Sequence, residues 1–163
     1  MRQWVMKRTI ITAGVLATLL TSAATSVASP AGAKGITKKA AGKQYQALAN
    51  AANAATNKFG AEASKWNNST TNAQFVADAK PLIAKFNKFD AGLIDDRWPP
   101  AARADVRSLV TSIAPVIGDL QSLSTVTLPS APTWVTTFER DVDGVKTAGA
   151  HVRHDLGLPP AKD

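Results

Sequence analysis

The sequence predicts an all-α protein, an antiparallel up-down-up-down four-helix bundle preceded by a signal peptide. Two observations predict the helices: apolar residues recur at intervals of three and four in four segments, and no segment alternates with the period of a strand. A third observation predicts the topology, because connections as short as these make consecutive helices antiparallel neighbours. We expect the bundle to span residues 44–158 and residues 159–163 to form a tail.

The first 33 residues have the composition of a secretory signal peptide. Arg2, Lys7 and Arg8 supply the positive start, an uncharged apolar stretch follows, and small residues near positions 28 and 33 fit cleavage by a signal peptidase. The alternative is an uncleaved membrane anchor, because the apolar run approaches the ~20 residues that span a bilayer. Its Thr and Ser residues favour cleavage. We therefore expect a secreted, extracellular or wall-associated protein with no transmembrane span after processing.

The charge of the chain indicates an anionic partner. Residues 34–88 contain nine lysines and two acids, whereas residues 89–163 contain seven basic and ten acidic side chains. A basic half is attracted to polyanions such as anionic cell-wall polymers or a membrane surface. We expect an anionic cell-wall polymer or another envelope protein as partner. Nucleic acid is excluded, because the basic half contains no Arg for bidentate phosphate contacts and no aromatic stacking ladder.

Residues 34–43 are predicted to form a basic flexible leader. This Gly- and Ala-rich stretch contains too few large apolar side chains to offset the ordering of its backbone. The first helical stripe begins at Tyr45 and ends at Trp66, on a helix that starts near Thr37 or Ala40. The leader's lysines, which we expect to meet the anionic partner, are Lys34, Lys38, Lys39 and Lys43.

The second and third helices each contain a proline. Residues 71–74, Thr-Asn-Ala-Gln, have the form of a capping box at the start of the second helix. The apolar stripes of the two helices run through residues 75–93 and 106–123. Pro81 and Pro115 lie inside these stripes, and we expect a kink at each or, at the first, a short lead-in helix.

The fourth stripe, residues 134–156, has a clear end. Gly157 stands where a left-handed cap belongs, and two prolines follow shortly after it. In the connection before this helix, Val126 and Leu128 are expected to pack against the bundle edge. Three tryptophans are expected to close the ends of the core, with each indole N–H finding an acceptor. They are Trp66, Trp98 and Trp134.

Two groups of polar side chains are candidate sites. An amide stripe on the first helix is either a hydrogen-bonding face for a glycan or a partner, or simply a neutral solvated face. It consists of Gln46, Asn50, Asn53 and Asn57. On the last helix, His151 and His154 have a spacing that can hold a metal when a third ligand converges. No stripe brings another His or a Glu to them, so we expect two solvated histidines near a helix C-terminus.

The sequence contains no recognisable catalytic constellation. It has no Gly-x-Ser-x-Gly turn and no Gly-rich phosphate loop. The absence of cysteine excludes disulfides, thiolate metal sites and a cysteine nucleophile. With Glu62 and Glu139 as its only glutamates, the chain cannot assemble a four-Glu di-iron site. The Asp95-Asp96 pair lacks the spacing of a calcium loop. We predict no enzymatic activity and no cofactor.

Short motifs in the chain resemble an uncharacterised group of exported actinobacterial helical proteins. They are Phe89-Asp90, residues 97–100, Asp119-Leu120 and residues 155–160. The resemblance covers most of the region after the signal peptide and implies a helical fold and export. Because the group has no assigned activity, the resemblance implies no functional residue.

The sequence therefore predicts an exported binding or interaction module of the cell envelope or extracellular space, with an unknown ligand. One alternative is a metal-handling protein or enzyme that uses the His151/His154 helix end. A second alternative is a structural envelope protein that is attached electrostatically through its basic leader.

Overall fold

The regular secondary structure of the described residues is helical. In the computed structural model, which describes residues 36–94, 98–127 and 129–161, no residue lies in a strand. The elements are α1 (Lys38–Ala63), α2 (Asn72–Leu93), the short 3-10 helix η1 (Pro100–Ala102), α3 (Arg103–Ser122) and α4 (Ala131–Asp155). The predicted all-α class and the number of long helices are therefore confirmed.

Several sequence predictions concern residues outside the described ranges. The predicted signal peptide, residues 1–33, lies there, as do Lys34 of the predicted leader, the acidic Asp95-Asp96 pair and Leu128. Among the helices that are described, none combines the length and the apolar character needed to cross a membrane.

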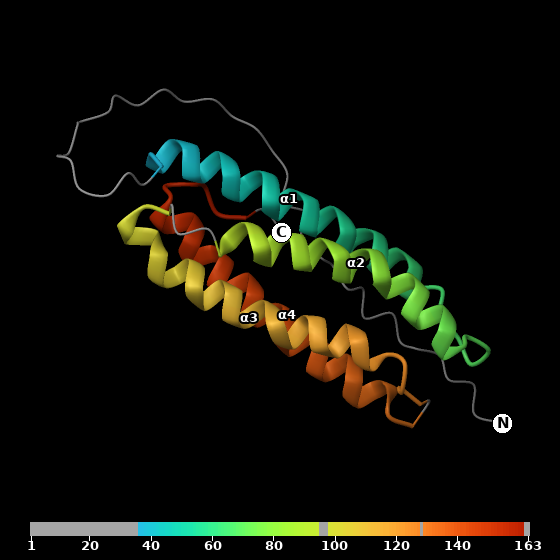
Figure 1. Ribbon diagram of the computed structural model, residues 1–163. Coiled ribbons are helices and arrows are strands. Elements are labelled where there is room, and N and C mark those ends of the chain that lie inside the picture. The colour runs from blue at the N-terminus through green and yellow to red at the C-terminus, as the bar shows by residue number, and fades with distance from the viewer. Residues whose placement is uncertain (1–35, 95–97, 128, 162–163) are drawn as a thin grey trace.

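Consecutive helices pack side by side around one core (Figure 1). α1 packs on α2, α2 on α3, and α3 on α4. Aromatic side chains bring α1 into contact with α4, since the ring centroids of Phe59 and Phe138 lie 6.0 Å apart. The core contains residues from every predicted stripe, including Phe86 of α2, Leu109 of α3 and Val152 of α4.

The start of α1 corrects the predicted leader. The helix begins at Lys38, and the Thr37 hydroxyl accepts a hydrogen bond from the backbone N–H of Ala40 over 3.2 Å. Ala41 and Gly42 are buried. A Cβ at Gly42 would lie 3.1 Å from the Leu158 side chain, so its absence permits close contact with the end of the chain. The small residues pack rather than remain flexible, and the bundle begins before residue 44.

Helix ends follow the predicted local chemistry. The Thr71 hydroxyl accepts a hydrogen bond from the N–H of Gln74 over 3.3 Å at the start of α2. Gly157 has a φ of +67°, and the next residue's N–H donates to the carbonyl of Arg153 over 2.8 Å. This is the hydrogen bond of a Schellman cap. α2 and α3 both continue through their internal prolines, so no separate lead-in helix precedes α2.

The three tryptophans lie at helix ends, and each indole N–H has an acceptor. Trp66, after α1, donates to the Asp78 carboxylate on α2 over 2.9 Å. Trp98 is buried and donates to a carbonyl at the end of α2 over 2.8 Å. Trp134, in the first turn of α4, donates to the Asp119 carbonyl on α3 over 2.8 Å. These contacts confirm the predicted role of the tryptophans.

Candidate binding surface

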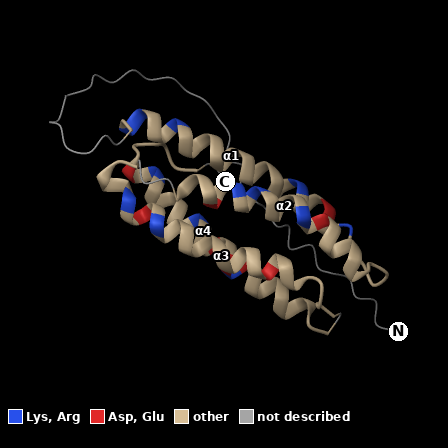
Figure 2. Cartoon of the chain, in the orientation of Figure 1, with Lys and Arg blue, Asp and Glu red and all other residues tan. Residues whose placement is uncertain are grey.

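Charge is divided unevenly between the two pairs of helices. Residues 36–94, which contain α1 and α2, carry eight lysines and three carboxylates. The described residues of 98–161, which contain α3 and α4, carry five basic and six acidic side chains (Figure 2). All eight lysines are exposed. They define the basic α1–α2 surface: Lys38, Lys39, Lys43, Lys58, Lys65, Lys80, Lys85 and Lys88.

A groove of about 630 Å³ lies between α1 and α2 on this surface. Most of its lining is small or apolar, because short alanine side chains leave the space between the two helices unfilled. The apolar lining residues are Ala51, Ala54, Ala55 and Phe59 of α1 and Ala77, Pro81 and Leu82 of α2.

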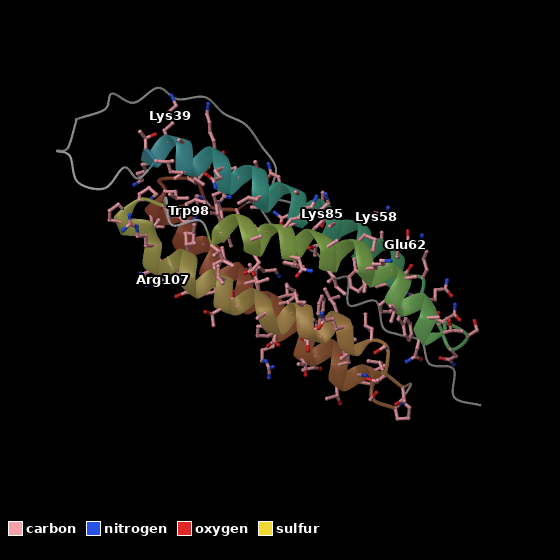
Figure 3. The ribbon with its side chains drawn as sticks, in the orientation of Figure 1. Lys39, Lys58, Glu62, Lys85, Trp98 and Arg107 are labelled. Carbon is pink, nitrogen blue, oxygen red and sulfur yellow. The ribbon has the colours of Figure 1, made fainter. Side chains whose placement is uncertain are left out.

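Four charged side chains also line the groove, and two of them are engaged within the protein. The Glu62 carboxylate lies 2.7 Å from the Lys65 Nζ. The Asp78 carboxylate accepts the indole N–H already described. Among the described residues, no carboxylate lies within 4.0 Å of the Nζ of Lys58 or Lys85. These lysines come from α1 and α2 respectively and lie in one region of the surface (Figure 3). The groove thus combines two cations with an apolar floor.

The lysines predicted to bind a partner lie elsewhere on the same surface. Lys38, Lys39 and Lys43 occupy the first two turns of α1. Lys43 and Lys58 are separated by fifteen residues of one helix, which corresponds to about 22 Å along its axis. The structure therefore brings the three predicted lysines together at the start of α1 but does not place them in the groove.

The amide stripe of α1 is only partly exposed. Asn50 is exposed, whereas Gln46, Asn53 and Asn57 are half-buried. The Nδ2 of Asn53 is buried, and no acceptor among the described residues binds it. A buried donor without a partner costs folding free energy. The stripe therefore combines one solvated amide with three partly covered ones.

The two histidines are exposed on α4. The Nδ1 of His154 lies 3.4 Å from a carboxylate oxygen of Asp155. Within the part of the chain that the structure describes, no three His, Asp or Glu side chains come together as metal ligands. The structure thus brings the predicted pair no third ligand from those residues.

A shallower hollow of about 230 Å³ lies where α3 meets the start of α4. Hydroxyl groups line it beside Trp134 and Asp119, and they belong to Ser122, Thr125, Ser130, Thr133 and Thr137. The Trp134 indole N–H lies 3.1 Å from the Ser122 hydroxyl.

Burial, and next the nearby Asp141 carboxylate, raise the pKa of Asp119 in this hollow. One carboxylate oxygen of Asp119 is buried without a donor among the described residues. The Trp134 indole, the Ser122 hydroxyl and the Asp119 carbonyl of this hollow are engaged in hydrogen bonds within the protein.

No family model, curated protein or solved structure matches the chain.

Sequence reasoning did not identify the groove. The sequence features that point to the groove are the Ala51-Ala52 and Ala54-Ala55 pairs, which are followed by Lys58. Their spacing places one alanine of each pair beside the core stripe rather than in it. Identifying a groove also requires knowing that the facing residues of α2 are Ala77 and Pro81, and helix pairing determines this.

Proposed function

We propose that the protein is an exported binding module of the cell envelope or extracellular space, without enzymatic activity, that binds an anionic polymer through the basic α1–α2 surface. The observation that carries the proposal is the excess of exposed lysines over carboxylates on that surface. Such an excess attracts polyanions over several ångströms. Lysine is a flexible point charge, which suits a polymer with irregular charge spacing better than a fixed phosphate site.

We further infer an antiparallel up-down-up-down arrangement of the four helices. In Figure 1 the colour order runs toward the lower right along α1 and α3 and returns along α2 and α4. The connections support this arrangement, since α1 ends at Ala63 and α2 begins at Asn72. α1 and α2 are then neighbours whose lysines form one surface. Export rests on the composition of residues 1–33 and on the resemblance to exported helical proteins.

Retention on immobilised poly(glycerol phosphate) tests the proposed function. We expect the purified protein to be retained at low ionic strength and released as salt rises past about 0.15 M, where the screening length is ~8 Å. The variant Lys43→Gln/Lys80→Gln/Lys88→Gln should elute at clearly lower salt. The matched control is Arg107→Gln/Arg140→Gln/Lys146→Gln, which removes the same charge from α3 and α4.

The comparison of these two variants separates a surface from a general charge effect. A much smaller shift in the control supports the α1–α2 surface as the binding surface. Equal shifts in both variants would contradict the proposal, because net charge alone would then determine retention. A lack of retention of the unmodified protein at low salt would also contradict it.

A further inference from the structure

We propose that the groove between α1 and α2 binds a single-chain anionic amphiphile such as a fatty acid. Its hydrocarbon chain lies along the alanine-lined floor, and its head group lies between Lys58 and Lys85. The inference rests on the proposed function, because it takes the same basic surface as a binding surface. It adds the class of small ligand that this part of the surface accepts.

The shape of the groove favours a thin chain. Its volume of about 630 Å³ falls within the ~300–1,000 Å³ typical of small-molecule sites. α1 and α2 approach closely at one end, since a Cβ at Gly92 would lie 2.7 Å from the Leu48 side chain. Along α1 the lining of the groove begins about one turn beyond this contact, at Ala51. A docked helix is ~10–12 Å across and would need deep pockets for large anchors, which an alanine floor does not supply.

The charges of the groove favour an anionic head group at one position. Glu62 is paired with Lys65, and Asp78 accepts a tryptophan N–H, so neither carboxylate is paired with Lys58 or Lys85. A carboxylate between the two lysines would be attracted by both of them. The carboxylates repel a head group from their end of the groove. The hydrocarbon chain lies on the apolar floor, which includes Ala51 and Ala54.

The apolar floor excludes a small inorganic anion as the best ligand. Phosphate or sulfate alone would leave the exposed methyl groups of Ala51 and Ala54 in water. An amphiphile covers this surface, and burial of each CH₂ strengthens binding. Two lysines also provide positive charge without the planar guanidinium of an arginine, which recognises phosphate through two parallel hydrogen bonds.

The test is a titration of the purified protein with octanoate, decanoate and dodecanoate below their micelle concentrations, followed by calorimetry. Intrinsic tryptophan fluorescence supplies a second readout, because the indole N–H of Trp66 binds Asp78 in the groove lining. We expect the Kd to fall about two- to fourfold for each added CH₂. A Kd that does not depend on chain length would overturn the proposal.

Charge variants test the position of the head group. Lys58→Gln/Lys85→Gln should weaken dodecanoate binding about tenfold. The matched control, Lys43→Gln/Lys80→Gln, also removes one exposed lysine from each helix, but outside the groove lining. It should leave the Kd nearly unchanged. Equal weakening by both pairs would contradict a head group between Lys58 and Lys85.

Floor variants test the position of the chain. Ala51→Gln/Ala54→Gln introduces polar groups at exposed helix positions that line the groove. Glutamine is a good helix former, so the fold is retained and the melting temperature checks this. The control is Ala47→Gln/Ala61→Gln, at exposed α1 positions outside the lining. Only the floor variant should lose the chain-length dependence, and retention of that dependence would overturn the proposal.

Poly(glycerol phosphate) retention of the two lysine variants separates this inference from the proposed function. Both variants should weaken retention similarly, because each removes two charges from the same surface. Retention without dodecanoate binding would overturn the amphiphile site alone, whereas dodecanoate binding without retention would overturn polymer binding alone. Binding to anionic vesicles without binding to monomeric dodecanoate would identify the ligand as a membrane surface and also overturn the amphiphile site.

Discussion

The Tyr45 hydroxyl on α1 donates a hydrogen bond to the carbonyl oxygen of Gly149 on α4 over 3.3 Å, which joins the first and last helices in the core. Gly149 permits this contact, since a Cβ at that position would lie 3.0 Å from the hydroxyl oxygen. Burial raises the pKa of Tyr45 to about 12, against an opposing effect of the nearby Arg153 guanidinium. The hydroxyl therefore remains protonated, and able to donate, at neutral pH.

Glycine substitutions on α4 test this contact. Gly144→Ala should stabilise the protein by about 1 kcal/mol, because alanine favours a helix and a Cβ there has open space around it. Gly149→Ala should give no gain or a loss, because its Cβ pushes on the Tyr45 hydroxyl. Urea denaturation of both variants measures the difference. Equal gains at both positions would mean that Tyr45 moves aside at no cost.

Truncation tests the corrected start of the bundle. Deletion of residues 34–43 should lower the melting temperature by roughly 5–10 °C, because it removes the buried Ala41 and Gly42. The control Lys38→Gln/Lys39→Gln/Lys43→Gln removes charge but keeps the helix, and its melting temperature should stay close to that of the unmodified protein. An unchanged melting temperature after the deletion would contradict this correction and support the original prediction of a flexible leader.

Asp119 should make stability depend on pH. Its pKa in the folded protein is raised by burial and by Asp141, so the folded state binds the proton more tightly than the unfolded state does. Stability then falls as pH rises from about 3.9 through the raised value, and it stays lower above that value. Asp119→Asn should therefore stabilise the protein at pH 7 and lose this gain near pH 3.

Urea denaturation at both pH values measures the effect of Asp119. Asparagine keeps the backbone carbonyl that accepts the Trp134 N–H, so the packing contact is retained. The control is Asp143→Asn, since Asp143 is exposed and pairs with Lys146 over 3.0 Å. It should not stabilise the protein at pH 7. The same gain from both substitutions would assign the effect to net charge.

Local chemistry explains which parts of the fold could be predicted. Helix periodicity, the Thr71 cap and the Gly157 cap depend on residues close in sequence, and the structure agrees with each prediction. The prediction of a flexible leader was wrong for residues 38–43, because composition cannot reveal that Gly42 packs against Leu158, which is distant in sequence. The groove was missed for the same reason, because it needs the pairing of α1 with α2.

The amide stripe offers the last prediction, because Asn53 and Asn50 differ in burial on one helix. Asn53→Ala removes a buried Nδ2 without an acceptor among the described residues and also improves helix propensity, so it should stabilise the protein by about 1–2 kcal/mol. Asn50→Ala, at an exposed position, should give only the propensity gain of about 0.5 kcal/mol. Phe86→Ala should instead cost about 3–5 kcal/mol, since the ring is buried in the core. Urea denaturation of the three variants measures these changes, and equal gains at the two asparagines would mean that the buried Nδ2 has a water partner.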